Sequence, residues 1–265
     1  MNLCEIKKTE AEILEYFAQF CRKENIRFFL SNGTLLGAVK YGGFIPWDDD
    51  VDVLVPRQDY DRLISIFEDS EKYRLFSRER NLSFRFPFAK LCDMTTRKEE
   101  PFVDNGMALG LDIDIFPLDA WPENEQDAKV LLHRIRGSIR VLNLAKLQYN
   151  HGKSRIRTIV KYVCIAGAKM VGTERPLRRI DRLRKSVKTG PAARYIGCVT
   201  WPVYGEREIL PSELFAQTLE VTFEGKKYPA PIGYDAYLRS LYGNYEADPP
   251  EEEQCTHHSF KAYRL

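Results

Sequence analysis

Four aspartates gather near the start of the chain, at Asp48, Asp49, Asp50 and Asp52. Adjacent like charges repel and aspartate is depleted in strands, so this cluster is hard to explain as a fold device. Valines alternate with acids over residues 50–55, which predicts a core strand with Asp48, Asp50 and Asp52 on one face. An exposed acidic turn after Pro46 is the alternative interpretation. We favour a site that holds a cation.

A second acidic strand is predicted over residues 110–116, with Asp112 and Asp114 facing opposite to its apolar residues. An unpaired carboxylate in such surroundings would cost several kcal/mol or become protonated. Oxygen ligands suit Mg²⁺, or Mn²⁺, which proteins hold with one or two carboxylates and substrate phosphates. Two acidic strands could hold two metal ions about 4 Å apart. One of these acids would accept the proton of an attacking hydroxyl.

Two further features could bind phosphate. Gly33 and Thr34 precede a predicted helix, so backbone amides and the threonine hydroxyl could receive a phosphate at the positive helix end. A simple helix cap is the alternative. Lys90 lies in an aromatic-rich segment and could neutralise a donor phosphate, although a solvated strand lysine is an equal alternative.

The periodicity of apolar residues predicts the elements that position these groups. Helices are expected over residues 5–24, 35–39, 58–67 and 234–241, strands over 26–30, 73–77, 84–92 and 110–116, and a hairpin over 218–228. Two or three helices are expected between residues 123 and 188. We predict three parts: a catalytic core over 1–122, a basic helical insertion over 123–190, and a C-terminal segment over 191–265 that completes the active site.

Composition excludes several classes of protein. The 265 residues are 44% hydrophobic and can bury a large core, while 40 basic and 38 acidic residues leave a net charge of +2, which does not favour nucleic-acid binding. Six cysteines without a CxxC pair indicate reduced thiols. The charged N-terminus lacks the apolar region of a signal peptide, and no segment could span a bilayer. A cytoplasmic location is expected.

The motifs resemble the LicD family. The resemblance is strongest in FLSNGTLLGAV at 29–39 and GFIPWDDDVDV at 43–53, and it extends to DIDIFPLD at 112–119, YGNY at 242–245, Pro249-Pro250 and His257-His258. It implies an α+β fold, in which a nucleotidyltransferase-like mixed sheet is flanked by helices, with a helical insertion and a C-terminal helical and hairpin segment. It also implies transfer of phosphocholine from CDP-choline to a hydroxyl of teichoic acid, capsule or lipopolysaccharide, with release of CMP.

The resemblance also implies roles for individual residues. Gly33 and Thr34 match the phosphate motif, Asp50 and Asp52 the paired metal acids, and Asp114 the third acid. Asp48 is a further metal candidate, and Asp112 and Asp50 are catalytic candidates beside Asp114.

The cargo, the mechanism and the partners stay open at this stage. Phosphoethanolamine, glycerol phosphate or ribitol phosphate could replace phosphocholine, and true nucleotidyl transfer or a noncatalytic scaffold are rivals. A choline group would need an aromatic cage, for which the candidates are Trp47, Tyr41, Trp121, Trp201, Tyr204 and Tyr245. His257 and His258 are expected to contact phosphate or pack near the site rather than bind zinc.

The basic segment 153–188 has many cations but only two acids. It could lie on an anionic membrane and meet a lipid-linked acceptor, or it could be a solvated amphipathic helix on the core. RNA binding is a weaker third interpretation.

Overall fold

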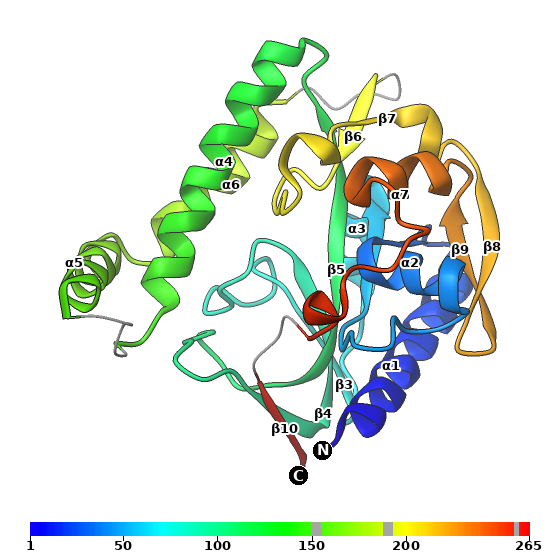
Figure 1. Cartoon of the computed structure of the whole chain (residues 1–265), viewed down its shortest axis with the longest axis horizontal. Helices are drawn as coiled ribbons and strands as arrows, with labels where there is room; N and C mark the ends of the chain where they lie inside the picture. Colours follow the sequence, from blue (N-terminus) through cyan, green and yellow to red (C-terminus); the bar gives the residue numbers. More distant parts are fainter. Residues whose placement is uncertain (150–154, 188–192, 257–259) are drawn as a thin grey trace.

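A computed structural model describes residues 1–149, 155–187, 193–256 and 260–265, and Figure 1 shows its arrangement. A mixed β-sheet forms the centre and helices flank it. Eight strands of the described chain belong to this sheet, whose main path runs β1-β2-β5-β4-β10. The predicted α+β architecture is therefore confirmed.

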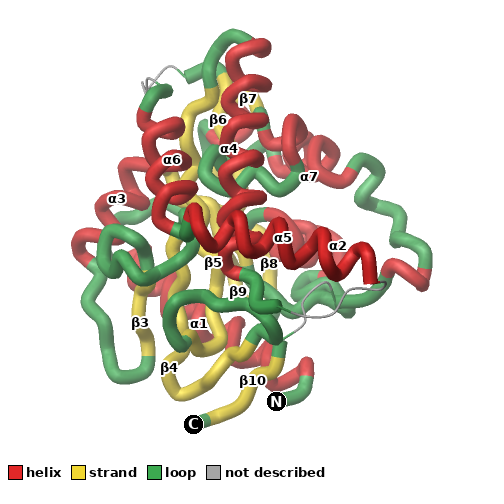
Figure 2. The backbone as a smooth tube through the Cα atoms, turned by 90° about the vertical axis from the view of Figure 1, so that its left-hand side faces the viewer, coloured by secondary structure: helices red, strands yellow, loops and turns green. Residues whose placement is uncertain are grey.

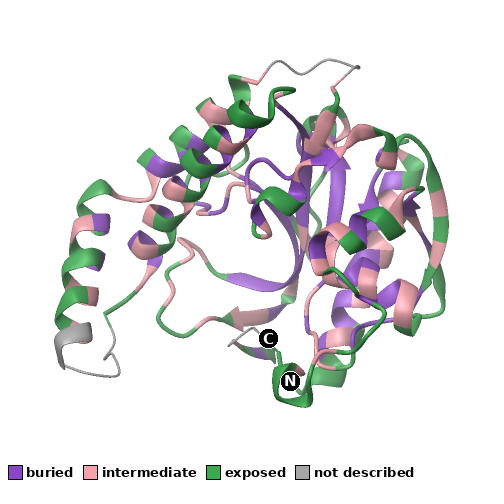
Figure 3. Ribbon diagram, turned by 45° about the horizontal axis from the view of Figure 1, so that its top comes forward, coloured by how far each residue is buried: buried purple, intermediate pink, exposed green. Residues whose placement is uncertain are grey.

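The long strand β5 (Leu109–Trp121) organises the sheet. It pairs in parallel with β2 (Asp52–Pro56) and antiparallel with β4 (Ala89–Glu99). Leu111, Ile113 and Ile115 are fully buried, and Figure 3 shows the centre of the sheet as the most buried part of the molecule. Because its acids alternate with these core residues, β5 holds them in fixed positions.

Shorter strands extend the sheet. They are β1 (Phe29–Leu30), β3 (Tyr73–Phe76), β6 (Tyr195–Gly197), β7 (Leu210–Pro211) and β10 (Lys261–Arg264). β10 pairs with β4, and the Met1 ammonium donates to the carbonyl of Ala262 at 2.6 Å. The two ends of the chain therefore meet at one edge of the sheet, as Figure 1 shows.

Four helices and a hairpin pack close to the sheet. The helices are α1 (Leu3–Lys23), α2 (Asn32–Tyr41), α3 (Arg57–Ile66) and α7 (Tyr234–Tyr242), and the hairpin joins β8 (Thr218–Phe223) to β9 (Lys226–Pro231). Three short 3-10 turns lie at Gly205–Glu208, Ser212–Phe215 and Glu251–Glu253. α1 buries Ile13, Leu14 and Phe17 completely, as its amphipathic pattern predicts.

Three helices form an arm beside this core: α4 (Glu125–Lys146), α5 (Arg155–Val171) and α6 (Glu174–Lys185). Residues of α4 and α6 build a second buried cluster with Trp121 and Val199. Figure 2 shows all three helices on the side of the molecule turned toward the viewer. No helix among the described residues is long and apolar enough to cross a membrane.

Two strand predictions need correction. β2 begins only at Asp52: Asp48 closes a turn in which its N–H donates to Ile45 O at 3.0 Å, and Asp49 and Asp50 belong to no strand. Asp48 and Asp50 therefore do not share a strand face with Asp52. β4 begins at Ala89 rather than residue 84, since Phe84 N–H donates into a turn to Asn81 O and Pro87 has no N–H for a ladder.

Candidate active site

The parallel pairing of β2 and β5 brings two predicted acids together. Asp52 lies in register with Asp114, so their side chains leave the same face of the sheet. Asp114 N–H also donates to Val51 O at 2.8 Å, which continues the pairing one residue before β2. The two acidic segments, more than 50 residues apart in sequence, thus form one site.

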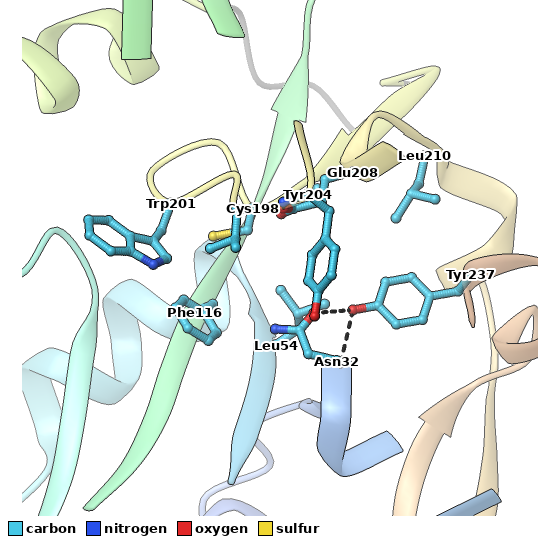
Figure 4. A pocket seen from close by; sticks show the side chains of 11 residues that line it. Asn32, Leu54, Phe116, Cys198, Trp201, Tyr204, Glu208, Leu210 and Tyr237 are labelled. Atoms are coloured by element: carbon cyan, nitrogen blue, oxygen red, sulfur yellow. Dashed lines mark hydrogen bonds between the residues drawn. The ribbon is translucent and has the colours of Figure 1, made fainter. Parts of the chain in front are cut away.

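The start of α2 holds Asp52 from both its backbone and its side chain. Asp52 N–H donates to Thr34 Oγ1 at 2.8 Å, and the Asn32 side-chain amide donates to Asp52 Oδ2 at 3.0 Å. Tyr237 on α7 donates to Asn32 Oδ1 at 2.9 Å and accepts from Asn32 N–H at 3.2 Å, and Figure 4 shows both contacts. A chain of hydrogen bonds therefore runs from α7 through α2 to the carboxylate.

Gly33 and Thr34 lie inside the first turn of α2 rather than before it, because the helix begins at Asn32, three residues earlier than predicted. A Cβ atom at Gly33 would come within 2.6 Å of Asp48 Oδ2, so glycine allows this carboxylate to lie against the helix start. Ser31, the residue before the helix, makes no side-chain cap bond within the described chain. The Asp48 carboxylate therefore lies at the positive end of α2, a position that favours an anion, whereas the buried Thr34 hydroxyl orients Asp52.

Lys90 on β4 joins the two acids of β5. Its ammonium donates to Asp112 Oδ2 at 2.5 Å and to Asp114 Oδ1, and Lys98 donates to Asp112 Oδ1 at 3.0 Å. Lys90 is only 6% exposed, so the solvated strand lysine was the wrong alternative. Asp112 is held between two lysines, while Asp114 stands between Lys90 and Asp52.

The three buried aspartates of the site differ strongly in their pKa values. Burial and then repulsion from Asp50 and Asp114 hold the pKa of Asp52 well above its ordinary value. Burial raises the pKa of Asp114 to about 6, although the Lys90 ammonium opposes this shift. Burial also opposes ionisation of Asp112, but Lys90 and Lys98 outweigh it and lower the pKa of Asp112. Asp112 is thus a stable anion, and Asp114 can exchange a proton near neutral pH.

Asp52 and Asp114 could together bind a divalent cation whose other ligands are substrate oxygens. No group of three or more aspartate, glutamate, histidine or cysteine side chains in the described chain is arranged to hold a metal by itself. Mg²⁺ is commonly bound by one or two carboxylates together with substrate phosphates, so two suffice. Their repulsion, seen in the raised pKa of Asp52, is what a cation would relieve.

The acidic turn and the aromatic candidates make contacts of their own. Asp49 accepts from the Thr256 hydroxyl at 2.8 Å, which ties the acidic turn to the C-terminal segment. Tyr41 and Trp47 meet edge to face, with ring centroids 6.3 Å apart. Trp121 is buried in the second cluster and is not available to a cage. His257 and His258 lie outside the described residues.

A small pocket of about 20 Å³ adjoins Asn32 and lies over Leu54 and Phe116 (Figure 4). These two residues follow Asp52 and Asp114 by two positions and so share their face of the sheet. Trp201 and Tyr204, two of the predicted cage residues, also line it. The volume suits one water molecule, so side chains must move before a trimethylammonium group could enter.

Sequence reasoning missed Asn32, Tyr237 and Lys98 as site residues. Asn32 precedes Gly33 directly and has a positive φ of 46°, which asparagine tolerates better than most residues. That small-residue turn was a usable signal. Tyr237 and Lys98 reach the site through tertiary packing, and no local pattern marks them.

Comparisons with known proteins agree with this geometry. Residues 25–145 match the nucleotidyltransferase domain of the LicD/FKTN/FKRP family model. The chain is 28% identical over 259 residues to the lipopolysaccharide cholinephosphotransferase LicD of Haemophilus influenzae, covering 96% of this chain and 94% of that protein. An uncharacterized protein of Rickettsia prowazekii is 35% identical over 72 residues, which is 27% of this chain and 24% of that protein. These matches confirm the predicted resemblance to the LicD family, whose nucleotidyltransferase domain model matches residues 25–145.

Proposed function

We propose that the chain is a transferase that moves phosphocholine from CDP-choline to a hydroxyl of a lipopolysaccharide precursor and releases CMP. The observation that supports this most is the in-register pair of Asp52 and Asp114 beside the first turn of α2. Such a pair suits a phosphorylated donor and its metal ion. The choice of cargo and acceptor follows the activity for which the Haemophilus influenzae relative is named, and that relative matches nearly the whole chain.

In the proposed reaction, the acceptor hydroxyl attacks the phosphorus atom that bears choline. A new phosphorus–oxygen bond forms to the glycan, and the bond between this phosphorus and the bridging oxygen of CMP breaks. The hydroxyl proton passes to a carboxylate, for which Asp114 is the candidate because it lies in register with Asp52 on the same face of the sheet.

The remaining groups bind and orient the donor. Asp52, fixed by Asn32 and Thr34, and Asp114 would hold Mg²⁺ or Mn²⁺, with Asp50 and Asp48 as further candidate ligands. Such an ion, when bound, neutralises charge on the donor phosphates. The first-turn amides of α2 would donate hydrogen bonds to a phosphate oxygen. Lys90 keeps Asp114 in place and adds positive charge where the leaving group departs.

Calorimetric titration with a panel of donors tests this proposal. CDP-choline, CDP-ethanolamine, CDP-glycerol and CDP-ribitol would each be added with and without Mg²⁺. Binding of CDP-choline that needs Mg²⁺ and exceeds that of the other three supports the proposal. Preference for another donor would mean that a different phospho-alcohol is transferred at the same site. Binding of none of the four donors contradicts the proposed transferase.

A further inference from the structure

Helix α5 presents an apolar face to solvent. Ile159, Val163 and Met170 are 63%, 67% and 83% exposed, and Val160 is 57% exposed. On the opposite side of the helix, Ile165 and Ala168 are buried. This strongly exposed stripe is unusual, because monomeric soluble proteins rarely leave contiguous apolar patches open to water.

The stripe follows the helical repeat. Positions 159, 163, 166 and 170 are separated by four, three and four residues, so they lie in one row along the helix. The exposed positions of α5 whose side chains are described, 158–171, are apolar with the single exception of Lys169. The face is therefore a continuous apolar surface with its one exposed cation outside the row.

The neighbouring helix α6 has the opposite character. All of its exposed residues are cationic: Arg175, Arg178, Arg179, Arg182 and Lys185. Arg178 and Lys185 pair with Glu174 and Asp181 on the same helix. Within the described chain, Arg175, Arg179 and Arg182 make no salt bridge. The arm thus has an apolar stripe on α5 and a surplus of positive charge on α6. Figure 2 shows these two helices on the same side of the molecule.

Two kinds of occupant could cover this face: a second copy of the chain or a lipid surface. A symmetric pair of copies would bring two cationic α6 faces toward each other, and such like charges disfavour association. An anionic bilayer instead offers a hydrocarbon boundary for the stripe and lipid phosphates for the arginines.

We propose that the α5–α6 face docks on an anionic lipid bilayer. Ile159, Val163 and Met170 enter the headgroup boundary, and the arginines of α6 lie at the level of the lipid phosphates. This docking does not depend on the transfer reaction. If the proposed function holds as well, docking brings the active site to the surface where a lipid-anchored acceptor resides.

Vesicle co-sedimentation of the full chain tests the proposal. We expect binding to vesicles of phosphatidylcholine with about one third phosphatidylglycerol, and little binding to pure phosphatidylcholine. The double variant Val163→Glu with Met170→Glu should bind at least about tenfold more weakly, because it places charge in the stripe. Arg179→Ser with Arg182→Ser should also weaken binding and reduce its sensitivity to salt.

The matched control places the same charges elsewhere. Leu82 and Val203 are 73% and 62% exposed and lie outside the arm, so Leu82→Glu with Val203→Glu should bind vesicles like the parent chain. Thermal unfolding of each variant verifies that it folds. Absence of binding to anionic vesicles, or binding that the stripe variant leaves unchanged, overturns the proposal. So does a dimer in sedimentation velocity that the stripe variant abolishes, because a second copy would then cover the face.

Discussion

At the scale of single residues, the site brings several carboxylates close together, but only some of them have a cationic partner. Asp112 has two lysine partners, whereas Asp52 has an amide partner, and burial together with two acidic neighbours raises the pKa of Asp52. This difference separates a structural anion from the acids that suit a metal ion. The sequence indicated that the acids would gather, but the two lysines that pair with Asp112 come from β4, which lies beside β5 only in the folded chain.

Asp52→Asn and Asp114→Asn should each lower the rate of CMP release by about 10²–10³-fold, as is typical when one electrostatic group of an active site is removed. Asp52→Asn keeps the side-chain volume and removes a repelled charge, so thermal stability should stay near that of the parent, whereas Asp114→Asn should lower stability because it removes an ion-pair partner of the buried Lys90. Asp127→Asn, an exposed change in the first turn of α4, is the matched control. Undiminished turnover by Asp52→Asn would contradict the assigned role.

Glu208 makes folding depend on pH. Burial raises its pKa from 4.5 to about 8, and its carboxylate accepts from Tyr204 N–H at 2.5 Å. The folded chain therefore binds an extra proton between these pH values, so this contribution to the unfolding free energy is complete below pH 4.5 and is lost as pH rises through 8.

Glu208→Gln should remove this dependence, because glutamine can accept the same bond without a charge. Urea unfolding of both proteins would be measured at about pH 5.5 and about pH 8.5. The free energy of unfolding of the parent should be lower at the higher pH by on the order of a few kcal/mol, and that of the variant should not show this decrease. Equal losses in parent and variant would assign the pH dependence to other groups.

At the scale of elements, α2 is the part that positions the site. It supplies Asn32 and Thr34 to Asp52, and it packs against the turn that leads into the acids. A Cβ at Gly37 would lie 2.4 Å from Gly43 O and 3.0 Å from Ile45 N, both of which belong to backbone. Small residues in α2 therefore permit a close approach between helix and turn.

Gly37→Ala should lower the unfolding free energy by about 1–3 kcal/mol, because the turn must move. Gly137 on α4 is the matched control, since a Cβ there meets nothing within 4 Å. Gly137→Ala should raise the unfolding free energy by up to about 1 kcal/mol through helix propensity. Denaturant titration measures both, and equal effects of the two substitutions would contradict the close packing of α2.

Local pattern predicted most elements and could not predict several of their ends. α1, α3, α7 and the long acidic strand β5 have clear periodicity, and each appears near its predicted range. The acidic run before Asp52 alternates like a strand, yet hydrogen bonds to Ile45 and to the Asp48 side chain make it a turn. Such competition between turn and ladder bonds is invisible to a period-two pattern.

At the scale of the whole molecule, the two ends of the chain meet at one edge of the sheet. β10 pairs with β4, buries Ala262 and lies beside the start of α1. No local signal in the last residues predicts this pairing, because it joins segments more than 150 residues apart.

Removing residues 260–265 should lower the unfolding free energy by on the order of 2 kcal/mol, since it unpairs an edge of β4 and exposes apolar surface. Leu265→Ser, at a residue that is 70% exposed, should change stability little and is the control. Guanidinium unfolding distinguishes the two. An unchanged free energy of unfolding in the shortened chain would show that β10 does not stabilise the sheet.

Product identity tests the central proposal most directly. The chain would be incubated with Mg²⁺, a lipopolysaccharide precursor without phosphocholine, and CDP-choline labelled in the choline methyl groups or in the cytidine ring. We predict that the choline label joins the glycan and that the cytidine label leaves as CMP in equal amount. Cytidine label on the glycan, with free phosphocholine released, would contradict phosphocholine transfer and show nucleotidyl transfer.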